Sequence, residues 1–281
     1  MRVLVTNDDG IHAEGLLALV QALDVWVAQA PHGEERVVTV VAPDTNYSGA
    51  GAAVGDMYLK PGLAYSRVDL AGVSNIACFG LDATPALCAI VGNLGGFGPR
   101  YDVIVSGINA GVNVGRSVLH SGTVGACLTG TQLGLAGLAV SVRTSHETSI
   151  GYGTAATLAV AALADLESAP PHTVINLNVP NVELKDLKGV RRARISTAGI
   201  IKSSAGATST LPTEAFGMIP LTLGSSVPDL GDVSDEADDD DGALVAAGFA
   251  AVTVIRSVHE AGDDEADALA RNAVAAMSEV R

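Results

Sequence analysis

The chain has 281 residues, of which 48% are hydrophobic and only 4% aromatic, and its formal net charge is −15. This length allows one large domain with a sizeable core, and the negative charge argues against a basic groove for a nucleic-acid polymer. The three cysteines, Cys78, Cys88 and Cys127, form no CxxC pair and are interpreted as small core residues. No signal peptide or membrane-spanning stretch is evident, so we expect a soluble, cytoplasmic protein with no membrane partner.

Apolar runs of two kinds alternate from residue 2 to residue 180. Runs rich in β-branched residues predict strands, and apolar residues spaced three or four apart predict helices. The predicted strands, in chain order, cover residues 2–6, 35–43, 65–72, 101–107, 137–142 and 172–180. The predicted helices cover residues 16–23, 82–94, 123–133 and 151–166. This alternation predicts an α/β fold with a doubly wound, mostly parallel sheet.

The chain beyond Val182 differs in composition. Residues 229–241 carry eight carboxylates, which we interpret as a solvated loop, because the spacing of a calcium-binding EF-hand is absent. Residues 243–255 are predicted to form a strand or a pair of strands, and residues 263–280 a terminal helix. We therefore predict two parts, a core over 1–182 and a C-terminal extension over 183–281.

Three polar loops follow predicted strands. They read "NDDG", "APDTNYSGAG" and "SGINAGVNVG". Because ligands bind beyond the carboxyl ends of parallel strands, we expect the three loops to converge at one edge of the sheet. The second loop belongs to residues 44–62, which are rich in turn formers and predict a long loop or a projecting hairpin.

The first loop places two carboxylates side by side, in Asp8 and Asp9. On one interpretation Asn7 and Asp8 only cap a helix or form an Asx turn. On the other, the two charges repel each other and are tolerated because a cation lies between them. Ser48 of the second loop adds a hydroxyl, and the third loop adds amide side chains. Oxygen ligands of this kind favour Mg²⁺ or Mn²⁺ over zinc.

Two further stretches suit a phosphate group. The third loop is rich in glycine and presents backbone N–H groups. The stretch "HSGTVGA" begins a predicted helix, where Ser121 is an ordinary N-cap, part of an anion cradle, or both. The sequence has no Walker lysine, no GxSxG and no HExxH, which excludes the enzyme classes that those motifs mark.

Four stretches together resemble the SurE family of metal-dependent nucleoside monophosphate phosphatases. They read "VTNDDGIHAEG", "VVAPDTNYSGAG", "DVIVSGINAGVNVG" and "HSGTVGACLTG", and the resemblance extends to about Pro180. The resemblance implies a Rossmann-like core with a projecting hairpin and a C-terminal extension exchanged between subunits, in homodimers or homotetramers. It implies that one divalent cation per subunit is held by Asp8, Asp9, Ser48 and Asn109. It also implies that the phosphate lies near Ser106, Gly107, Ser121, Gly122 and Thr123.

The chain departs from the family pattern at a few positions. Leu87 replaces an acidic residue that relatives commonly have, and Arg116 and Ser117 stand where acidic residues are frequent. Val112 stands where proline is usual. The residues that the resemblance assigns to the metal are intact, so these departures bear on substrate preference.

The predicted function is hydrolysis of nucleoside 5′- or 3′-monophosphates. Asp8 is expected to orient or deprotonate the attacking water, and Asn109 to neutralise charge on the phosphoryl oxygens. Two alternatives remain open: a transferase that uses "NDD" to anchor the diphosphate of a nucleotide sugar, and a non-catalytic protein that binds metal and nucleotide.

Overall fold

The fold is dominated by one large, mostly parallel sheet. The structure is a computed structural model that describes residues 1–55, 62–144, 150–170, 172–197, 202–205, 221–224, 239–256 and 258. The strands of the sheet are β1 (Arg2–Thr6), β2 (Val37–Pro43), β3 (Tyr65–Val68), β4 (Ala77–Leu81), β5 (Val103–Ala110), β6 (Ala136–Val142), β7 (Thr173–Val179), β8 (Val190–Arg192) and β11 (Ala250–Arg256). Within the described residues they form nine strands in the order β3-β4-β2-β1-β5-β6-β7-β11-β8. Strands β4, β2, β1, β5, β6 and β7 are parallel, whereas β3 and β11 run antiparallel to β4 and β7.

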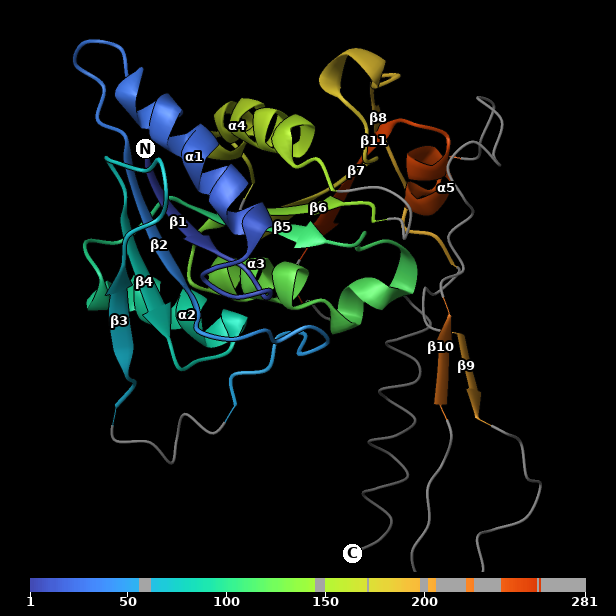
Figure 1. The fold of residues 1–281 in the computed structure, drawn as a ribbon, viewed down its shortest axis with the longest axis horizontal. Coiled ribbons are helices and arrows are strands. Elements are labelled where there is room, and N and C mark those ends of the chain that lie inside the picture. Colours follow the sequence, from blue (N-terminus) through green and yellow to red (C-terminus); the bar gives the residue numbers. More distant parts are fainter. Residues whose placement is uncertain are drawn as a thin grey trace, which may run out of the picture.

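Helices cover both faces of this sheet. The α-helices are α1 (Glu14–Ala28), α2 (Pro85–Val91), α3 (Gly122–Gln132), α4 (Gly153–Glu167) and α5 (Asp241–Ala246), and shorter helical turns are η2 (Gly92–Gly96), η3 (Gly115–His120) and η4 (Leu184–Asp186). Helices α1 and α4 lie on one face, and α2 and α3 on the other (Figure 1). The predicted α/β, doubly wound fold is therefore confirmed.

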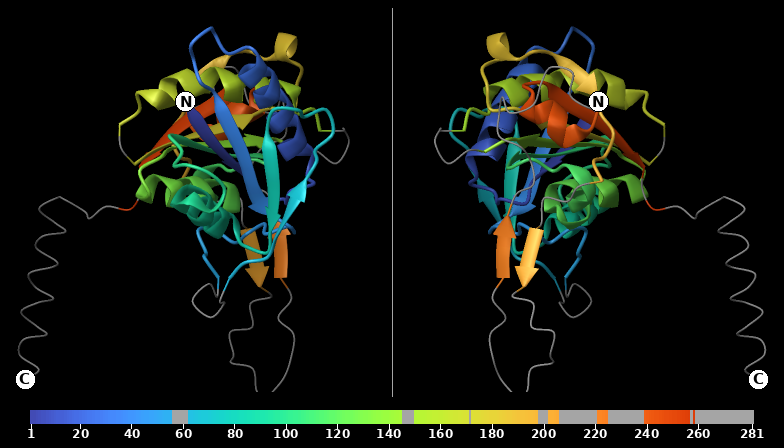
Figure 2. Two further views of the ribbon diagram at one scale, coloured as in Figure 1. Left: turned by 90° about the vertical axis from the view of Figure 1, so that its left-hand side faces the viewer. Right: turned by 90° about the vertical axis from the view of Figure 1, so that its right-hand side faces the viewer.

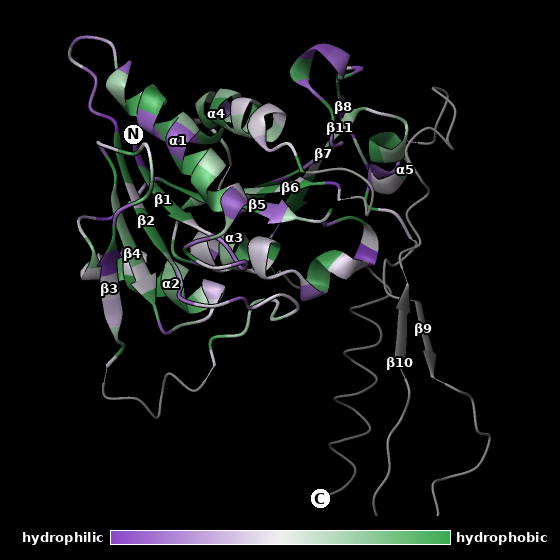
Figure 3. Cartoon of the chain, viewed as in Figure 1, coloured by the Kyte–Doolittle hydropathy of each residue, from purple (hydrophilic) through white to green (hydrophobic). Residues whose placement is uncertain are grey.

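Strand β1 lies at the centre of the sheet because both of its faces are apolar. Val3 and Val5 pack in the cluster beneath α1 and α4, whereas Leu4 packs in the cluster beneath α2 and α3. All three side chains are fully buried. Figure 3 shows the hydrophobic colouring of β1 and β2 and the hydrophilic colouring of the loop between β1 and α1.

The order of the strands creates a switch point beside β1. From β1 the chain continues to β2 and β4 on one side of it, and then returns to β5, β6 and β7 on the other. Ligands bind in doubly wound sheets at the carboxyl ends of the two strands that flank such a point. Here those strands are β1 and β5, which are the strands that precede Asp8 and Asn109.

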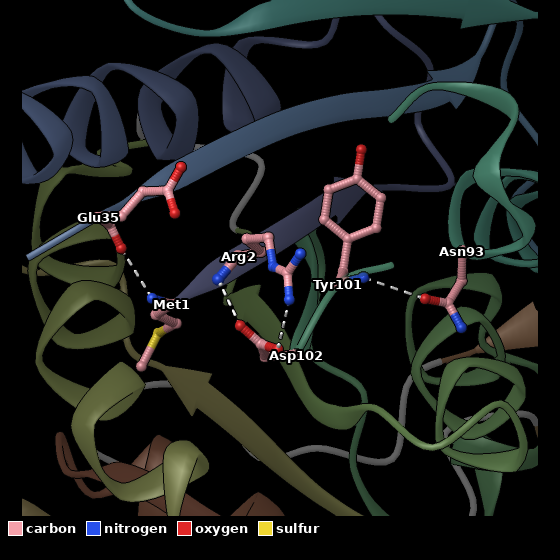
Figure 4. Close-up of polar contacts among 6 residues, drawn as sticks. All are labelled: Met1, Arg2, Glu35, Asn93, Tyr101 and Asp102. Atoms are coloured by element: carbon pink, nitrogen blue, oxygen red, sulfur yellow. Dashed lines mark hydrogen bonds and ion pairs between the residues drawn. The ribbon is translucent and has the colours of Figure 1, made fainter. Parts of the chain in front are cut away.

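The opposite edge of the sheet, where β1 starts, is held by polar contacts (Figure 4). The backbone N–H of Arg2 donates to Asp102 Oδ2 at 2.7 Å, and the two side chains form an ion pair at 3.9 Å. The amino group of Met1 donates to the carbonyl oxygen of Glu35 at 2.8 Å. These contacts fix β1 against its neighbours far from the predicted site.

One predicted strand region is partly wrong. Residues 243–255 contain the end of helix α5 as well as strand β11, so the first half is not a strand. Asp240 begins this helix, because its Oδ1 accepts a hydrogen bond from the backbone N–H of Ala243 at 2.7 Å. Strand β4 was not predicted, because the run "ACFGL" is short and has a glycine in it.

A small second sheet consists of β9 (Lys202–Ala205) and β10 (Leu221–Gly224), which pair antiparallel. It projects from the rest of the fold (Figure 2). The projecting hairpin was expected in residues 44–62, but the described part of that stretch, 44–55, consists of bends and turns. The predicted helix over 263–280 and most of the acidic stretch lie outside the described residues.

The division of the chain at residue 182 stays a prediction. Strands β8 and β11 belong by sequence to residues 183–281, yet they extend the sheet of the core through the β7–β11 ladder. Among the described residues, no helix is long and apolar enough to cross a membrane.

Candidate metal and phosphate site

The turn after β1 leaves both aspartates available for a ligand. Asn7 forms the turn, since its Nδ2 donates to the carbonyl oxygen of Gly10 at 2.9 Å and its Oδ1 accepts from the N–H of Gly10 at 3.2 Å. Gly10 has a φ of 103°, which favours glycine. Ala13 is the N-cap of helix α1, and no side chain caps the helix. Asp8 and Asp9 are therefore neither the helix cap nor the source of the turn.

The carboxylate of Asp8 lies against the first turn of helix α3. Its side chain is 3% exposed, and its Oδ1 accepts a hydrogen bond from Thr123 Oγ1 at 2.6 Å. A Cβ atom on Gly122 would lie 2.7 Å from Asp8 Cβ, so only glycine fits at this position. Burial raises the pKa of Asp8, although the hydroxyl of Thr123 and nearby backbone amides oppose the shift.

Asp9 links the loop that follows β2 with the end of β5. Its Oδ1 accepts from Asn46 Nδ2 at 3.4 Å, and its Oδ2 accepts from the backbone N–H of Ala110 at 3.3 Å. Burial and then the charge of Asp8 raise the pKa of Asp9, while the Ala110 bond lowers it. Two carboxylates that repel each other in this way favour a divalent cation between their oxygens.

The loop after β2 folds over the backbone of Asp8. The N–H of Tyr47 donates to the carbonyl oxygen of Asp8 at 2.7 Å. The next residue, Ser48, is exposed, and its N–H donates to Asn46 Oδ1 at 2.7 Å. Ser48 is thus brought to the edge of the sheet that carries Asp8 and Asp9, as the sequence predicted for this loop.

Asn109 lies near the end of β5, one residue before the N–H that bonds Asp9. Its Nδ2 donates to the carbonyl oxygen of Gly111 at 2.6 Å, which leaves the amide oxygen as the atom to face a cation. Asn109 pairs in register with Ser141 of β6. The predicted convergence is therefore present for the loops that carry the two aspartates and Ser48, whereas Asn109 joins them from the last residues of β5, which extends to Ala110 instead of ending at residue 107.

The residues expected near the phosphate fall into two groups. Ser121, Gly122 and Thr123 form the start of α3, where Ser121 Oγ accepts from the N–H of Val124 at 3.1 Å. Ser106 is fully buried on β5, and its hydroxyl has no hydrogen-bond partner in the described part of the chain. Gly107 follows with a φ of 135°. The first group borders Asp8, whereas the side chain of Ser106 is buried in the interior of the fold.

The departures from the family pattern have distinct surroundings. Leu87 is 4% exposed and packs in the cluster around α2, so it is a core residue here. Arg116 is exposed at the start of η3, and Ser117 Oγ donates to the carbonyl oxygen of Val114 at 2.6 Å. Val112 packs against the apolar cluster of α5.

Two residues near Asp9 were not found from the sequence. Asn46 stands two residues before Ser48, so its place in the same loop was a usable signal. Tyr152 gave no signal, because it is distant in sequence and directly precedes helix α4. Its Cε1 lies 3.0 Å from the position of a Cβ on Gly15, and burial, with the charges of Asp9 and Glu14, raises the pKa of Tyr152.

The candidate ligands for a cation include only two charged side chains. Across the described ranges, no three His, Cys, Asp or Glu side chains gather into a metal site. The candidate set has two carboxylates and two neutral oxygen donors instead. Such oxygens fit a hard divalent cation.

Comparison with known proteins identifies the family of this chain. The family model for "Survival protein SurE" matches residues 3–201. The chain belongs to the SurE family. Curated SurE relatives named 5′/3′-nucleotidase SurE are 40% identical in Cronobacter sakazakii and 38% in Salmonella arizonae, each over 69% of both chains. A crystal structure of the SurE protein from Aquifex aeolicus is similar over 91% of this chain and 93% of that one, with a TM-score of 0.67 and 26% identity.

Proposed function

We propose that this chain is a metal-dependent 5′/3′-nucleotidase, which hydrolyses nucleoside monophosphates to nucleoside and phosphate. The observation that carries the proposal is the pair of adjacent carboxylates, Asp8 and Asp9, at the switch point of the sheet. The pair is bordered by the Ser48 loop, the end of β5 and the start of α3. The names of the curated relatives support the same activity.

The residues that would hold the metal are Asp8, Asp9, Ser48 and Asn109, with one cation per subunit. Mg²⁺ or Mn²⁺ fits this donor set, because all four ligands are oxygens. The upward shifts of the pKa of Asp8 and of Asp9 support the fit, since a nearby cation would relieve the burial and repulsion of these charges. When bound, the cation supplies positive charge that polarises the phosphate and makes water more acidic.

The protein groups around the aspartates suit hydrolysis of a phosphate ester. Asp8 would orient the attacking water and accept its proton, held in place by Thr123. Asn109 would neutralise charge on the phosphoryl oxygens. The backbone N–H groups of the Ser121–Thr123 turn and of Gly107, next to Ser106, would bind the phosphate.

The test is release of phosphate from a panel of nucleoside 5′- and 3′-monophosphates. We expect phosphate release with Mg²⁺ or Mn²⁺ and little release with chelator. In the Asp9→Asn variant, the rate of phosphate release should fall on the order of 10²-fold or more. Nucleotide binding without release would instead support a non-catalytic binding protein. Cleavage of nucleotide sugars without any monophosphatase activity would support the transferase.

The assembly and the location of the protein belong to the same proposal. A homodimer or homotetramer is supported by the exposed apolar residues of the C-terminal part, which include Leu184, Val190, Ile195, Val254 and Val258. Light scattering on the full chain measures the subunit number, and a monomer would reject this part. The expected cytoplasmic location is checked by cell fractionation.

A further inference from the structure

Asp241, far from the site in sequence, is a buried carboxylate surrounded by backbone donors. Its two oxygens accept from the N–H of Gly115 at 2.9 and 3.1 Å, and one of them also accepts from Ser196 at 3.1 Å and Gly242 at 3.0 Å. The residue is fully buried. A buried carboxylate is costly in free energy unless its oxygens are bonded, so these contacts define its place.

Apolar contacts join the same two parts of the chain. Val112 packs against the cluster formed by Leu244 and Val245 of α5. A Cβ on Gly242 would lie 3.6 Å from Val114 Cγ2, which places the first turn of α5 directly on the loop. Helix α5 therefore docks on residues 112–115 through both polar and apolar contacts.

Gly115 connects the contact with helix α5 to the candidate metal and phosphate site. It begins η3, which ends at His120 and leads directly into Ser121 and the first turn of α3. The carbonyl oxygen of His120 accepts from the N–H of Gly51 at 3.1 Å, so the same segment also holds the loop that carries Ser48. A shift of Gly115 would thus move both the phosphate turn and the Ser48 loop.

The segment that follows Asn109 is held by contacts of Asn113 that do not involve Asp241. The N–H of Asn113 donates to Asn178 Oδ1 at 2.7 Å, and the carbonyl oxygen of Asn113 accepts from Asn176 Nδ2 at 2.8 Å. The Nδ2 of Asn113 donates to Ser141 Oγ at 2.9 Å. These contacts fix the chain from the end of β5 to Asn113, so Asp241 anchors the next segment, which begins at Gly115.

We propose that Asp241 is a positioning residue, which couples the docking of α5 to the geometry of the Ser121–Thr123 turn and the Ser48 loop. The inference rests on the proposed nucleotidase function. It assigns to the C-terminal part of the chain a direct influence on phosphate binding, although α5 contributes no side chain to the site.

The test compares Asp241→Asn with Asp240→Asn in the full chain. Both variants remove one negative charge from the start of α5. Asn at position 240 still caps the helix, because asparagine is as good an N-cap as aspartate. A carboxamide at position 241 keeps only one acceptor oxygen, so its NH₂ group replaces the oxygen that accepts from the N–H of Gly115 at 2.9 Å, and that bond to Gly115 is lost.

We expect Asp241→Asn to raise the KM for adenosine 5′-monophosphate about tenfold and to raise the half-saturating Mn²⁺ concentration. Asp240→Asn should stay within about threefold of the wild type in both. Simple destabilisation lowers the fraction of active enzyme, which reduces kcat and leaves KM unchanged. If Asp241→Asn is folded by circular dichroism and keeps the wild-type KM and Mn²⁺ dependence, the proposal is wrong.

A measurement on the wild type covers the case in which Asp241→Asn does not fold. Coupling is reciprocal, so Mn²⁺ with inorganic phosphate should slow amide hydrogen exchange in residues 239–246 as well as in 112–123. The second half of helix α1, residues 21–28, serves as the unaffected control. Protection of 112–123 without any change in 239–246 would overturn the inference. A wild type that releases no phosphate from any nucleotide would instead reject the proposed function.

Discussion

Asp8 and Asp9 are neighbours in the sequence but have different surroundings. Asp8 is buried and accepts a hydrogen bond from Thr123, whereas Asp9 is partly exposed and contacts Asn46 and Ala110 more loosely. Burial raises the pKa of each, and for Asp9 the charge of Asp8 adds to the shift. Without a cation, both ionised side chains therefore reduce the stability of the fold at neutral pH.

The first prediction at this scale concerns Asp9→Asn in the presence of chelator. The folded pKa of Asp9 lies above its ordinary value of 3.8, so its stabilising contribution is present below that pH and is lost as the pH rises. The variant has no carboxyl group at position 9, so it does not lose stability when the pH rises. We expect its Tm to exceed that of the wild type by about 2 °C or more at pH 7, and the difference to vanish toward pH 4.

Thermal melts between pH 4 and pH 8 measure this difference. The matched control is Asp165→Asn, which removes an exposed carboxylate from α4 and should leave the Tm nearly unchanged. A variant at position 9 that is less stable than the wild type at neutral pH would show that the bond from Ala110 outweighs burial and repulsion.

At the scale of secondary-structure elements, the start of α3 positions Asp8. The helix presents Gly122 to the Asp8 side chain and Thr123 to its Oδ1, so the carboxylate fits into the first turn. Partial positive charge at a helix N-terminus favours a carboxylate there. The same turn is proposed to bind phosphate, which would bring the substrate next to Asp8.

We therefore expect Gly122→Ala to reduce kcat/KM on the order of 10²-fold, because the new Cβ displaces the Asp8 carboxylate. The required approach of 2.7 Å is shorter than real contacts allow. Gly153→Ala is the control, since Gly153 is also the first residue of its helix and has no atom within 4 Å of a Cβ. Steady-state kinetics of both variants check the prediction, and equal activities would contradict it.

The elements that the sequence predicted best are those with a clear apolar pattern. The β-branched run of β1 and the helical spacing of leucines in α1 are such patterns, and both elements were confirmed, whereas α5 was not predicted. Its run "DGALVA" has six residues with little contrast between polar and apolar positions, so the cap at Asp240 was the only local signal. Elements whose boundaries depend on one hydrogen bond are missed in this way.

At the scale of the whole molecule, local motifs predicted the convergence of three loops because the rule for parallel sheets is general. The contact between Asp241 and Gly115 was beyond reach, since it joins residues separated by 126 positions and no spacing rule relates them. The burial of Ser106 was missed for a similar reason. Which face of β5 the helix α3 covers depends on packing across the sheet.

The last prediction concerns the stability of the whole fold upon metal binding. A cation held by Asp8, Asp9, Ser48 and Asn109 would link the ends of β1 and β5 with the loop after β2. At a Mn²⁺ concentration one hundred times its dissociation constant, binding adds about 2.7 kcal/mol to the free energy of unfolding. We expect the Tm of the wild type to rise by about 5 °C, in proportion to the logarithm of the Mn²⁺ concentration. Calorimetry with Mn²⁺ and then chelator measures this rise, and the control is sodium chloride at the same ionic strength.

The Asn109→Ala variant tests one ligand in the same experiment. It removes one neutral ligand and should require more Mn²⁺ for the same rise in Tm, whereas an identical response would remove Asn109 from the ligand set.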